Sequence, residues 1–216
     1  MITECVESAL VELYADVGGP ASGAALAAVG SLARRELGPR SDIDLVLLHN
    51  GKASTKINTL ANDLWYPLWD ARIRVDHSVR TPAECAEVAG TELSAGVGLL
   101  DLRVIAGDAE LVKGARTALL DTWRGNARKR LPELLASLDE RVATFGDAAY
   151  LLEPDLKEAR GGFRDVSMLR ALSASWLTDR PHVGVREPYE RLLDVRDALH
   201  LAAGRTLDRL ISSETA

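Results

Sequence analysis

Two acidic residues, Asp42 and Asp44, are separated by a single residue and precede an apolar run, Leu45–Leu48. Residues two positions apart in a strand point to the same face, so both carboxylates are expected on one face of a strand over residues 42–48. A carboxylate at the start of a buried strand is costly unless it faces solvent or a cation. Two on one face suit Mg²⁺, which prefers oxygen ligands. On this pattern alone, Asp42 as a turn cap and Asp44 as a solvated strand residue stay open.

A glycine-serine pair, Gly30-Ser31, precedes the acids and follows the apolar segment 24–29. The segment predicts a strand and Gly30 a tight turn, whose backbone N–H groups suit a nucleotide phosphate. The turn and the acid pair together favour a metal-dependent nucleotidyl-transfer site. In such sites, two metal ions clamp the attacking and leaving oxygens of an in-line phosphoryl displacement. Asp42 and Asp44 are therefore predicted to be catalytic metal ligands.

Asp76 is the candidate for a third catalytic and metal-binding acid, because two divalent cations leave uncompensated charge with only two aspartates. It lies in residues 73–79, where apolar and polar residues alternate as in a strand with one buried face. The alternative is an exposed strand residue paired with Arg74 or Arg80. If Asp76 faces away from the first two acids, Asp101 takes the third role.

The periodicity of apolar residues divides the chain into a mixed half and a helical half. Expected helices cover residues 3–17, 54–70, 81–89 and 92–99, and expected strands cover 24–29, 42–48 and 73–79. A short apolar stretch follows at 102–106. From residue 109 onward the pattern is helical, with a break at 153–162. The predicted fold class is α+β, with a small mixed sheet in a domain over residues 1–107 and a helical bundle over residues 108–216. A boundary near Gly125 is the alternative.

Two expected helices begin with capping signals. Thr3 stands at the start of the first helix as a candidate N-cap. Thr81 and Glu84 have the spacing of a capping box, in which side-chain and backbone groups at the helix start bond each other reciprocally.

The composition argues against several classes of protein. The net charge of −6 is unlike that of a general nucleic-acid binder, which usually carries a basic surface. Cys5 and Cys85 are isolated, so reduced structural thiols in a cytoplasmic protein are expected. The small-residue stretch 21–33 is shorter than the roughly 20 residues that a membrane span needs. We therefore expect a cytoplasmic protein without nucleic-acid or membrane partners.

A second constellation combines three cations, Lys157, Arg160 and Arg164, with the glycine pair Gly161-Gly162. The glycines permit close backbone approach to a ligand, and a helix from about residue 164 offers its N-terminus to an anion. These donors suit a triphosphate. The alternative is a glycine-rich connection between helices with solvated charges, and the residues alone do not decide between the two. Neither a Walker A loop nor a G-x-G-x-x-G motif occurs in the chain.

The turn and acid pair resemble the polymerase-β-type nucleotidyltransferase superfamily. A closer resemblance is to the bacterial uridylyltransferase family that modifies the nitrogen-signalling protein PII, with actinobacterial members nearest. Four stretches carry it, at residues 29–37 with 41–45, 64–70 (LWYPLWD), 75–81 (VDHSVRT) and 154–166 (PDLKEARGGFRDV). The last two are specific to this family and its near relatives, and RVIAGD at 103–108 is a weaker fifth.

The resemblance implies transfer of UMP or AMP from UTP or ATP to a tyrosine of PII, with Mg²⁺ (or Mn²⁺) as cofactor and release of pyrophosphate. It implies metal ligation by the acid pair and supports a metal role for Asp76. It implies a nucleotide-binding role for six residues: Gly30, Ser31, Arg34, Lys157, Arg160 and Arg164.

The chain departs from the family pattern at two places. The family usually reads Gly-Gly-x-Gly-Arg where this chain has Gly30-Ser31-Leu32-Ala33-Arg34. If residue 33 needs a positive φ, Ala33 costs roughly 1 kcal/mol or more. None of the four histidines precedes an aspartate, so the His-Asp hydrolase site of full-length members is not found.

We accordingly expect a natural short form or an excised fragment without deuridylylation or glutamine sensing. Two other hypotheses stay open. One is a nucleotidyltransferase with another protein or a small molecule as acceptor, since a fold does not fix a function. The other is a degenerate domain that binds nucleotide without catalysis.

Overall fold

The computed structural model describes residues 2–51, 54–179 and 184–211. Contacts within the chain divide it into two compact units, Met1–Leu37 with Ser41–Thr122, and Gly38–Arg40 with Trp123–Ala216. The predicted division near residue 107 falls just before a long helix, whereas the two units divide inside that helix. The units are described one at a time.

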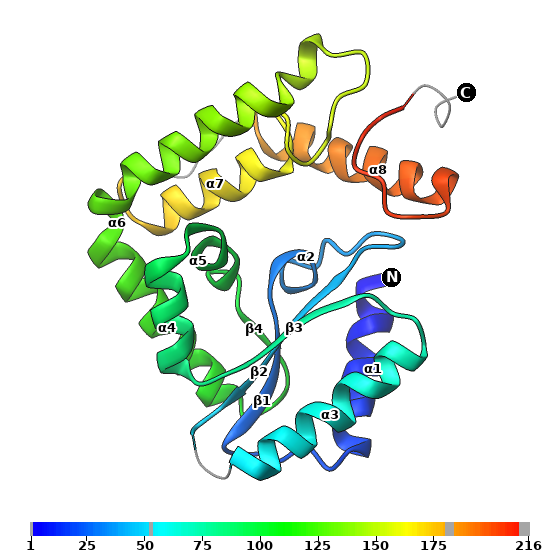
Figure 1. The fold of residues 1–216 in the computed structure, drawn as a ribbon, viewed down its shortest axis with the longest axis vertical. Coiled ribbons are helices and arrows are strands. Elements are labelled where there is room, and N and C mark those ends of the chain that lie inside the picture. The colour runs from blue at the N-terminus through cyan, green and yellow to red at the C-terminus, as the bar shows by residue number, and fades with distance from the viewer. Residues whose placement is uncertain (1, 52–53, 180–183, 212–216) are drawn as a thin grey trace. The chain divides into compact units, whose positions relative to one another are not determined.

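The first unit is built on one four-stranded mixed sheet (Figure 1). Its strands are β1 (Ala24–Ala28), β2 (Ile43–His49), β3 (Val75–Arg80) and β4 (Arg103–Gly107). The order across the sheet is β3-β2-β1-β4. Strand β1 is antiparallel to β2 and β4, and β2 is parallel to β3. The expected strands at 24–29, 42–48 and 73–79 are therefore confirmed, with bounds shifted by one or two residues, and the short apolar stretch at 102–106 forms most of β4.

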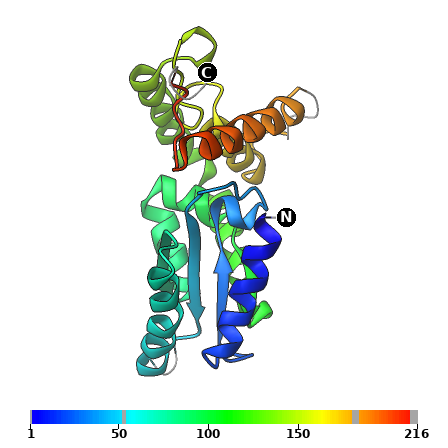
Figure 2. The ribbon, with the colours of Figure 1, turned by 90° about the vertical axis from the view of Figure 1, so that its right-hand side faces the viewer.

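Helices cover both faces of this sheet. On one face lie α1 (Ile2–Asp16) and α3 (Ser54–Asp70), and on the other lie α4 (Pro82–Thr91) and α5 (Leu93–Leu99) (Figures 1 and 2). The single turn α2 (Gly30–Ala33) follows β1 directly. The alternation of side chains along the strands sorts the core into two buried clusters, one for each face.

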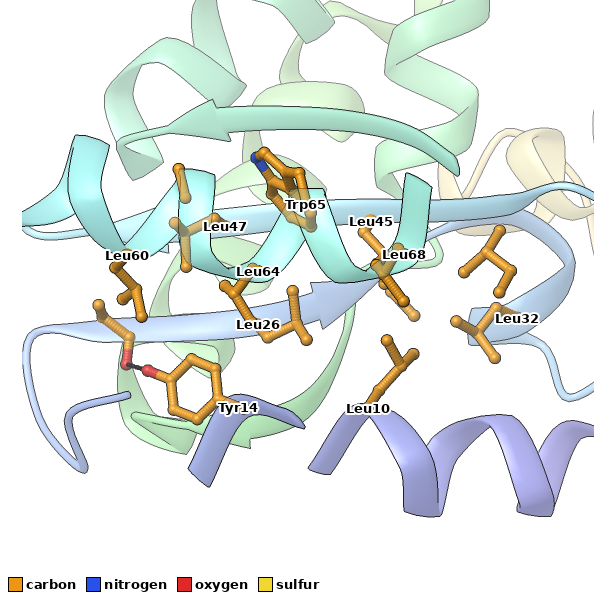
Figure 3. Packing of buried hydrophobic residues seen from close by; sticks show 14 of the residues in the cluster. Leu10, Tyr14, Leu26, Leu32, Leu45, Leu47, Leu60, Leu64, Trp65 and Leu68 are labelled. Atoms are coloured by element: carbon orange, nitrogen blue, oxygen red, sulfur yellow. Dashed lines mark hydrogen bonds between the residues drawn. The ribbon is translucent and has the colours of Figure 1, made fainter. Parts of the chain in front are cut away.

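The cluster beneath α1 and α3 is rich in leucine. Leu10 and Tyr14 of α1 and Leu64 of α3 point toward Leu26 of β1, and all are nearly or fully buried (Figure 3). The Tyr14 hydroxyl donates to the carbonyls of Pro20 and Ala24, at 3.0 and 3.1 Å. These contacts tie the end of α1 to the start of β1.

The capping signals have different outcomes. Thr81 and Glu84 form the predicted capping box at the start of α4, through both the side-chain and the backbone bond. Thr3 is not an N-cap, because α1 already begins at Ile2 and Thr3 is a buried helical residue. The expected strand from residue 73 begins at residue 75 because Arg72, with φ of +57°, turns the chain after α3.

The second unit is helical, as predicted. It contains most of α6 (Ala109–Phe145), then α7 (Phe163–Ala174) and α8 (Arg186–Ala203), with a 3-10 turn at Ala148–Tyr150. The Trp123 indole donates to the Ala171 carbonyl at 2.8 Å and joins α6 to α7. The break between helices starts earlier than the predicted residue 153, directly after Phe145. Residues 180–183 and 212–216, which the helical prediction also covered, lie outside the described residues.

Residues 38–40 belong to this helical unit although they lie between α2 and β2 in the sequence. The buried His200 of α8 has Nδ1 2.6 Å from the Pro39 carbonyl oxygen, which fixes the proton on Nδ1 because a carbonyl only accepts. The Thr206 hydroxyl donates to the Arg40 carbonyl at 2.6 Å. Three sequential residues thus pack with helices that follow much later in the chain.

Among the described helices, none combines the length and the apolar character that crossing a membrane requires.

Candidate active site

Two of the predicted acids are direct neighbours across the parallel strands β2 and β3. Asp44 is paired in register with Asp76, so the two side chains leave the sheet on the same face. That face is the one on which Val46 and Leu48 pack with α4 and α5, since alternate residues of β2 share it. Asp44 and Asp76 lie near the starts of their strands, before these apolar residues begin. The prediction that Asp76 stands on the strand beside the first acid pair is confirmed.

The Asp44 carboxylate lies against the backbone of Gly30. A Cβ atom placed on Gly30 would be 2.3 Å from Asp44 Oδ2, and Gly30 has φ of +58°. Both facts require glycine at this position. The Val29 N–H also donates to the Asp44 carbonyl, at 3.1 Å, and joins the end of β1 to the start of β2. The turn and the acid that the sequence placed together are therefore in contact.

Asp42 lies just before β2 and is about half exposed. Its Oδ1 is 2.9 Å from Arg74 Nε, in an ion pair whose side chains are 52% and 56% exposed. An ion pair this exposed contributes little to stability, about 0 to 1 kcal/mol. A cation thus already lies beside Asp42, and a metal ion bound there would replace Arg74 as its partner.

These acids fit a hard divalent cation by their chemistry and their placement. Asp44 Oδ2 lies in the space that a side chain at residue 30 would fill, and Asp76 adds a second carboxylate on the same face. Within the described ranges, however, no three His, Cys, Asp or Glu side chains converge on one point as a closed metal site. The metal and catalytic roles of Asp42, Asp44 and Asp76 stay predictions.

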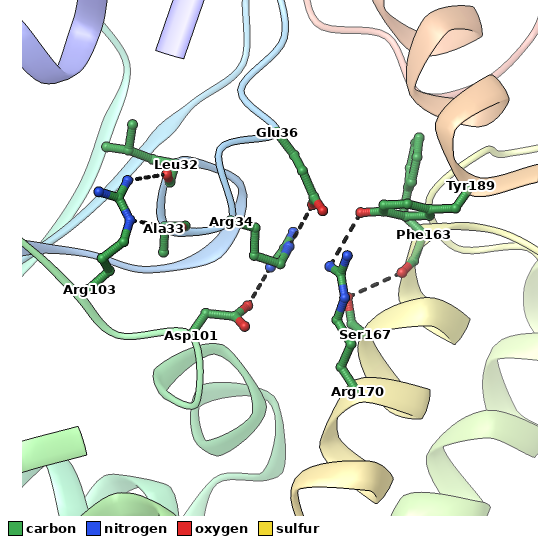
Figure 4. Close-up of polar contacts among 10 residues, drawn as sticks. All are labelled: Leu32, Ala33, Arg34, Glu36, Asp101, Arg103, Phe163, Ser167, Arg170 and Tyr189. Carbon is green, nitrogen blue, oxygen red and sulfur yellow. Dashed lines mark hydrogen bonds and ion pairs between the residues drawn. The ribbon is translucent and has the colours of Figure 1, made fainter. Parts of the chain in front are cut away.

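Asp101, the rival for the third role, is engaged elsewhere. Its Oδ2 accepts from Arg34 Nη1 at 2.6 Å, and Arg34 Nε donates to Glu36 at 2.7 Å (Figure 4). All three side chains are mostly buried. Burial lowers the pKa of Arg34, but the carboxylates of Asp101 and Glu36 raise it further, so the net shift is upward. Arg34 therefore carries a permanent charge between two acids, and its predicted nucleotide-binding role stays a prediction.

Ala33 does not strain the turn. It lies within α2, and the left-handed residue after this turn is Arg35, with φ of +60°. The penalty considered for a methyl group at residue 33 therefore does not arise. The Ala33 carbonyl oxygen accepts from Arg103 Nε at 2.8 Å, and the Leu32 carbonyl accepts from Arg103 Nη2 at 2.8 Å (Figure 4). Sequence reasoning named Arg74 only as a possible partner of Asp76, and Arg103 only within the weak RVIAGD resemblance.

The basic constellation of the helical unit lies in the loop before α7 and in the first turn of that helix. Lys157 and Arg160 are exposed, and Arg164 Nε pairs with Glu158 at 3.2 Å. Gly162 is required by the loop itself, because a Cβ there would be 2.5 Å from the Leu156 carbonyl oxygen. The Gly161 N–H donates to Asp165 at the start of α7. The glycine pair therefore serves a close turn of the chain, and triphosphate binding by the three cations stays a prediction.

Comparison with known proteins covers nearly the whole chain. Residues 12–98 match the family model described as "Nucleotidyltransferase domain", and residues 129–216 match "GlnD PII-uridylyltransferase". A bifunctional uridylyltransferase/uridylyl-removing enzyme of Streptomyces coelicolor is 51% identical over 99% of this chain. The chain belongs to the PII-uridylyltransferase family.

Other members of the family are similar over most of the chain. The enzymes of the same description from Mycobacterium tuberculosis and Corynebacterium glutamicum are 43% and 40% identical, over 95% and 88% of this chain. The chain spans about a quarter of the length of these relatives, 26% for the Streptomyces coelicolor enzyme and 27% for the other two. A solved structure of the toxin-antitoxin MntA-HpeT mutant D39ED41E aligns with 62% of this chain and 96% of its own, at 12% identity and a TM-score of 0.36.

The family match agrees with the fold. The nucleotidyltransferase match covers β1, β2 and β3 with the turn and all three acids, and the uridylyltransferase match covers the helical unit from within α6 onward. The predicted fold class, a nucleotidyltransferase domain followed by a helical domain, is confirmed.

Proposed function

We propose that this chain transfers UMP or AMP from UTP or ATP to a tyrosine of the PII signal protein and releases pyrophosphate. The observation that carries the proposal is the contact between the Gly30 turn and the Asp44 carboxylate, with Asp76 in register beside it. The family membership supports the same activity, since relatives over this span are described as uridylyltransferases. A cytoplasmic location is part of the proposal and is supported by the two free cysteines, Cys5 and Cys85.

Asp42, Asp44 and Asp76 would hold Mg²⁺ (or Mn²⁺). The bound metal would stabilise charge on the transferring phosphoryl group and on the leaving pyrophosphate. The protein's own part is to keep the Asp44 and Asp76 carboxylates on one face of the sheet, with Asp42 just before β2. Parallel strands joined by backbone hydrogen bonds place Asp44 and Asp76 without the freedom of a loop.

The nucleotide is assigned to the turn that follows β1. Backbone N–H groups at Gly30 and Ser31 would contact the phosphates, because glycine lets the chain approach a ligand closely. Lys157, Arg160 and Arg164 would add positive charge toward the triphosphate. Arg34 would act as part of the same nucleotide-binding segment.

The deciding experiment incubates the chain with a PII protein, Mg²⁺ and either labelled UTP or labelled ATP. We expect label on a PII tyrosine with one of the two nucleotides, and pyrophosphate in equal amount. Asp42→Asn and Asp44→Asn should abolish labelling and leave the fold intact. Asp63→Asn, which neutralises an exposed acid of α3, is the matched control and should label as the wild type does. Near-normal turnover of both active-site variants would refute the assignment.

A further inference from the structure

Arg103 connects three parts of the first unit that are distant in sequence. At the start of β4, its guanidinium donates to the carbonyls of Leu32 and Ala33 and pairs with the Glu7 carboxylate of α1. The Arg103 and Glu7 side chains are 28% and 19% exposed, so the contacts are largely shielded from water. The guanidinium fork fits two neighbouring carbonyls and one carboxylate at once.

The two carbonyls belong to the end of α2, which is only four residues long. A helix of one turn is not stable alone, because nucleation fixes several residues for a single hydrogen bond. The last carbonyls of a helix also lack partners inside it. Arg103 donates to the Ala33 carbonyl and is a second donor to the Leu32 carbonyl, which also accepts from the Arg35 N–H at 3.1 Å. Its positive charge lies at the helix C-terminus, where a cation is favoured.

The other end of the same turn is Gly30, which lies against Asp44. Because α2 is a single turn closed by the bond from the Arg34 N–H to the Gly30 carbonyl, at 3.1 Å, holding its end at Leu32 and Ala33 also restrains its beginning, where Gly30 has φ of +58°. The charge of Arg103 is already balanced by Glu7. The arginine is therefore suited to holding the turn in place and not to binding phosphate itself.

We propose that Arg103 is a positioning residue, which fixes the Gly30–Ala33 turn so that Gly30 meets the Asp44 carboxylate in the geometry needed for metal and nucleotide. This inference rests on the proposed function. It assigns the placement of the turn to a single side chain. The Arg103 guanidinium contacts Glu7, Leu32 and Ala33, which are neither predicted metal ligands nor predicted nucleotide-binding residues.

The test compares two substitutions of Arg103 with one of Arg35. Arg103→Met keeps the apolar stem and removes every donor, and Arg103→Lys keeps a charge and part of the donor set. Arg35→Met is the matched control, because Arg35 lies 3.8 Å from the same Glu7 carboxylate but is 69% exposed. Each full chain is examined for thermal unfolding, for Mn²⁺ affinity by electron paramagnetic resonance, and for nucleotide KM and kcat.

We expect Arg103→Met to weaken Mn²⁺ binding by about 10-fold or more, the usual effect of removing a residue that orients a ligand. Arg103→Lys should recover part of that affinity, and Arg35→Met should bind Mn²⁺ as the wild type does. The nucleotide KM should rise in the same order as the metal affinity falls. A purely structural role would lower the unfolding temperature without changing Mn²⁺ affinity in the folded protein.

Two outcomes would count against the inference, and they differ. If the wild type binds Mn²⁺ but Arg103→Lys and a folded Arg103→Met bind it equally well, Arg103 does not position the turn, and the proposed function is unaffected. If Arg103→Met does not fold, an unchanged Mn²⁺ affinity and an unchanged nucleotide KM in Arg103→Lys refute the inference in the same way. If the wild type itself binds neither Mn²⁺ nor nucleotide, the proposed function fails and this inference fails with it.

Discussion

Replacing Gly30 with alanine should damage the site through two separate effects. The first is backbone strain, because alanine at φ of +58° costs about 1 kcal/mol. The second is a collision, because the new Cβ would be 2.3 Å from Asp44 Oδ2. Reaching an ordinary contact requires the carboxylate to move by about 1 Å, and turning it off its rotamer costs about 1 kcal/mol more. The expected total is about 2 kcal/mol of folding free energy.

Gly18→Ala separates the two effects. Gly18 has φ of +71°, and a Cβ there would have no neighbour within 4 Å, so this variant carries the strain without the collision. Urea unfolding, monitored through hydrogen exchange of the β2 amides, would report the stability of the first unit for both variants. Mn²⁺ affinity would report the position of Asp44, since Mg²⁺-type sites tolerate little displacement of a ligand.

We expect Gly18→Ala to lose about 1 kcal/mol and to bind Mn²⁺ normally. Gly30→Ala should lose about twice as much and bind Mn²⁺ at least about 10-fold more weakly. If Gly30→Ala matches Gly18→Ala in stability and the wild type in Mn²⁺ affinity, the close approach of turn and acid is not required, and the reasoning for the site is wrong.

Three further predictions concern charge, pH and thiol reactivity. Arg160→Glu should weaken nucleoside triphosphate binding, measured by calorimetry without acceptor. Arg128→Glu, an equal charge change at an exposed residue of α6, should not weaken it. A loss confined to PII modification would make the loop that contains Arg160 a docking surface for the acceptor instead. Burial, with a contribution from Asp108, raises the pKa of Tyr14 to about 12 from 10.0, so its stabilisation is present below pH 10 and is lost as the pH rises to about 12. That loss, about 2 to 3 kcal/mol, should be absent from urea unfolding of Tyr14→Phe, and an unchanged pH profile would contradict it. Burial also raises the pKa of the Cys85 thiol to about 11, so iodoacetamide at neutral pH should label exposed Cys5 alone until the protein unfolds; labelling of Cys85 in the folded protein, read by mass spectrometry, would count against this.

Local patterns predicted much of the first unit. Alternation along residues 73–79 correctly placed Asp76 on a strand, and the apolar run after Asp44 correctly predicted a buried strand, because both signals depend only on neighbours in the sequence. The register that pairs Asp44 with Asp76 is a tertiary property; the need of two divalent cations for a third acid suggested that Asp76 lies nearby, but no pattern gave the register itself.

Contacts between distant residues explain what the sequence did not reveal. Arg34 meets Asp101 across 67 positions, and Arg103 meets Glu7 across 96. No spacing rule relates such residues, so Asp101 was a reasonable candidate for the metal, and Arg103 entered only as part of the RVIAGD resemblance. The units divide inside α6 after residue 122, near the alternative boundary at Gly125 and not at residue 107; the sequence did not decide between the two, because a helix of 37 residues carries no local signal of where one unit ends.

The position of residues 38–40 limits how the protein can be dissected. Because Pro39 bonds to His200 and Arg40 to Thr206, no single cut of the chain releases either unit whole. A fragment ending at residue 122 keeps these three residues but removes their partners, and a fragment starting at residue 123 leaves the buried His200 without its carbonyl acceptor. An expression vector for the helical half would have to carry residues 38–40 as a separate or grafted peptide, and isolated halves are expected to be less stable than the contiguous chain.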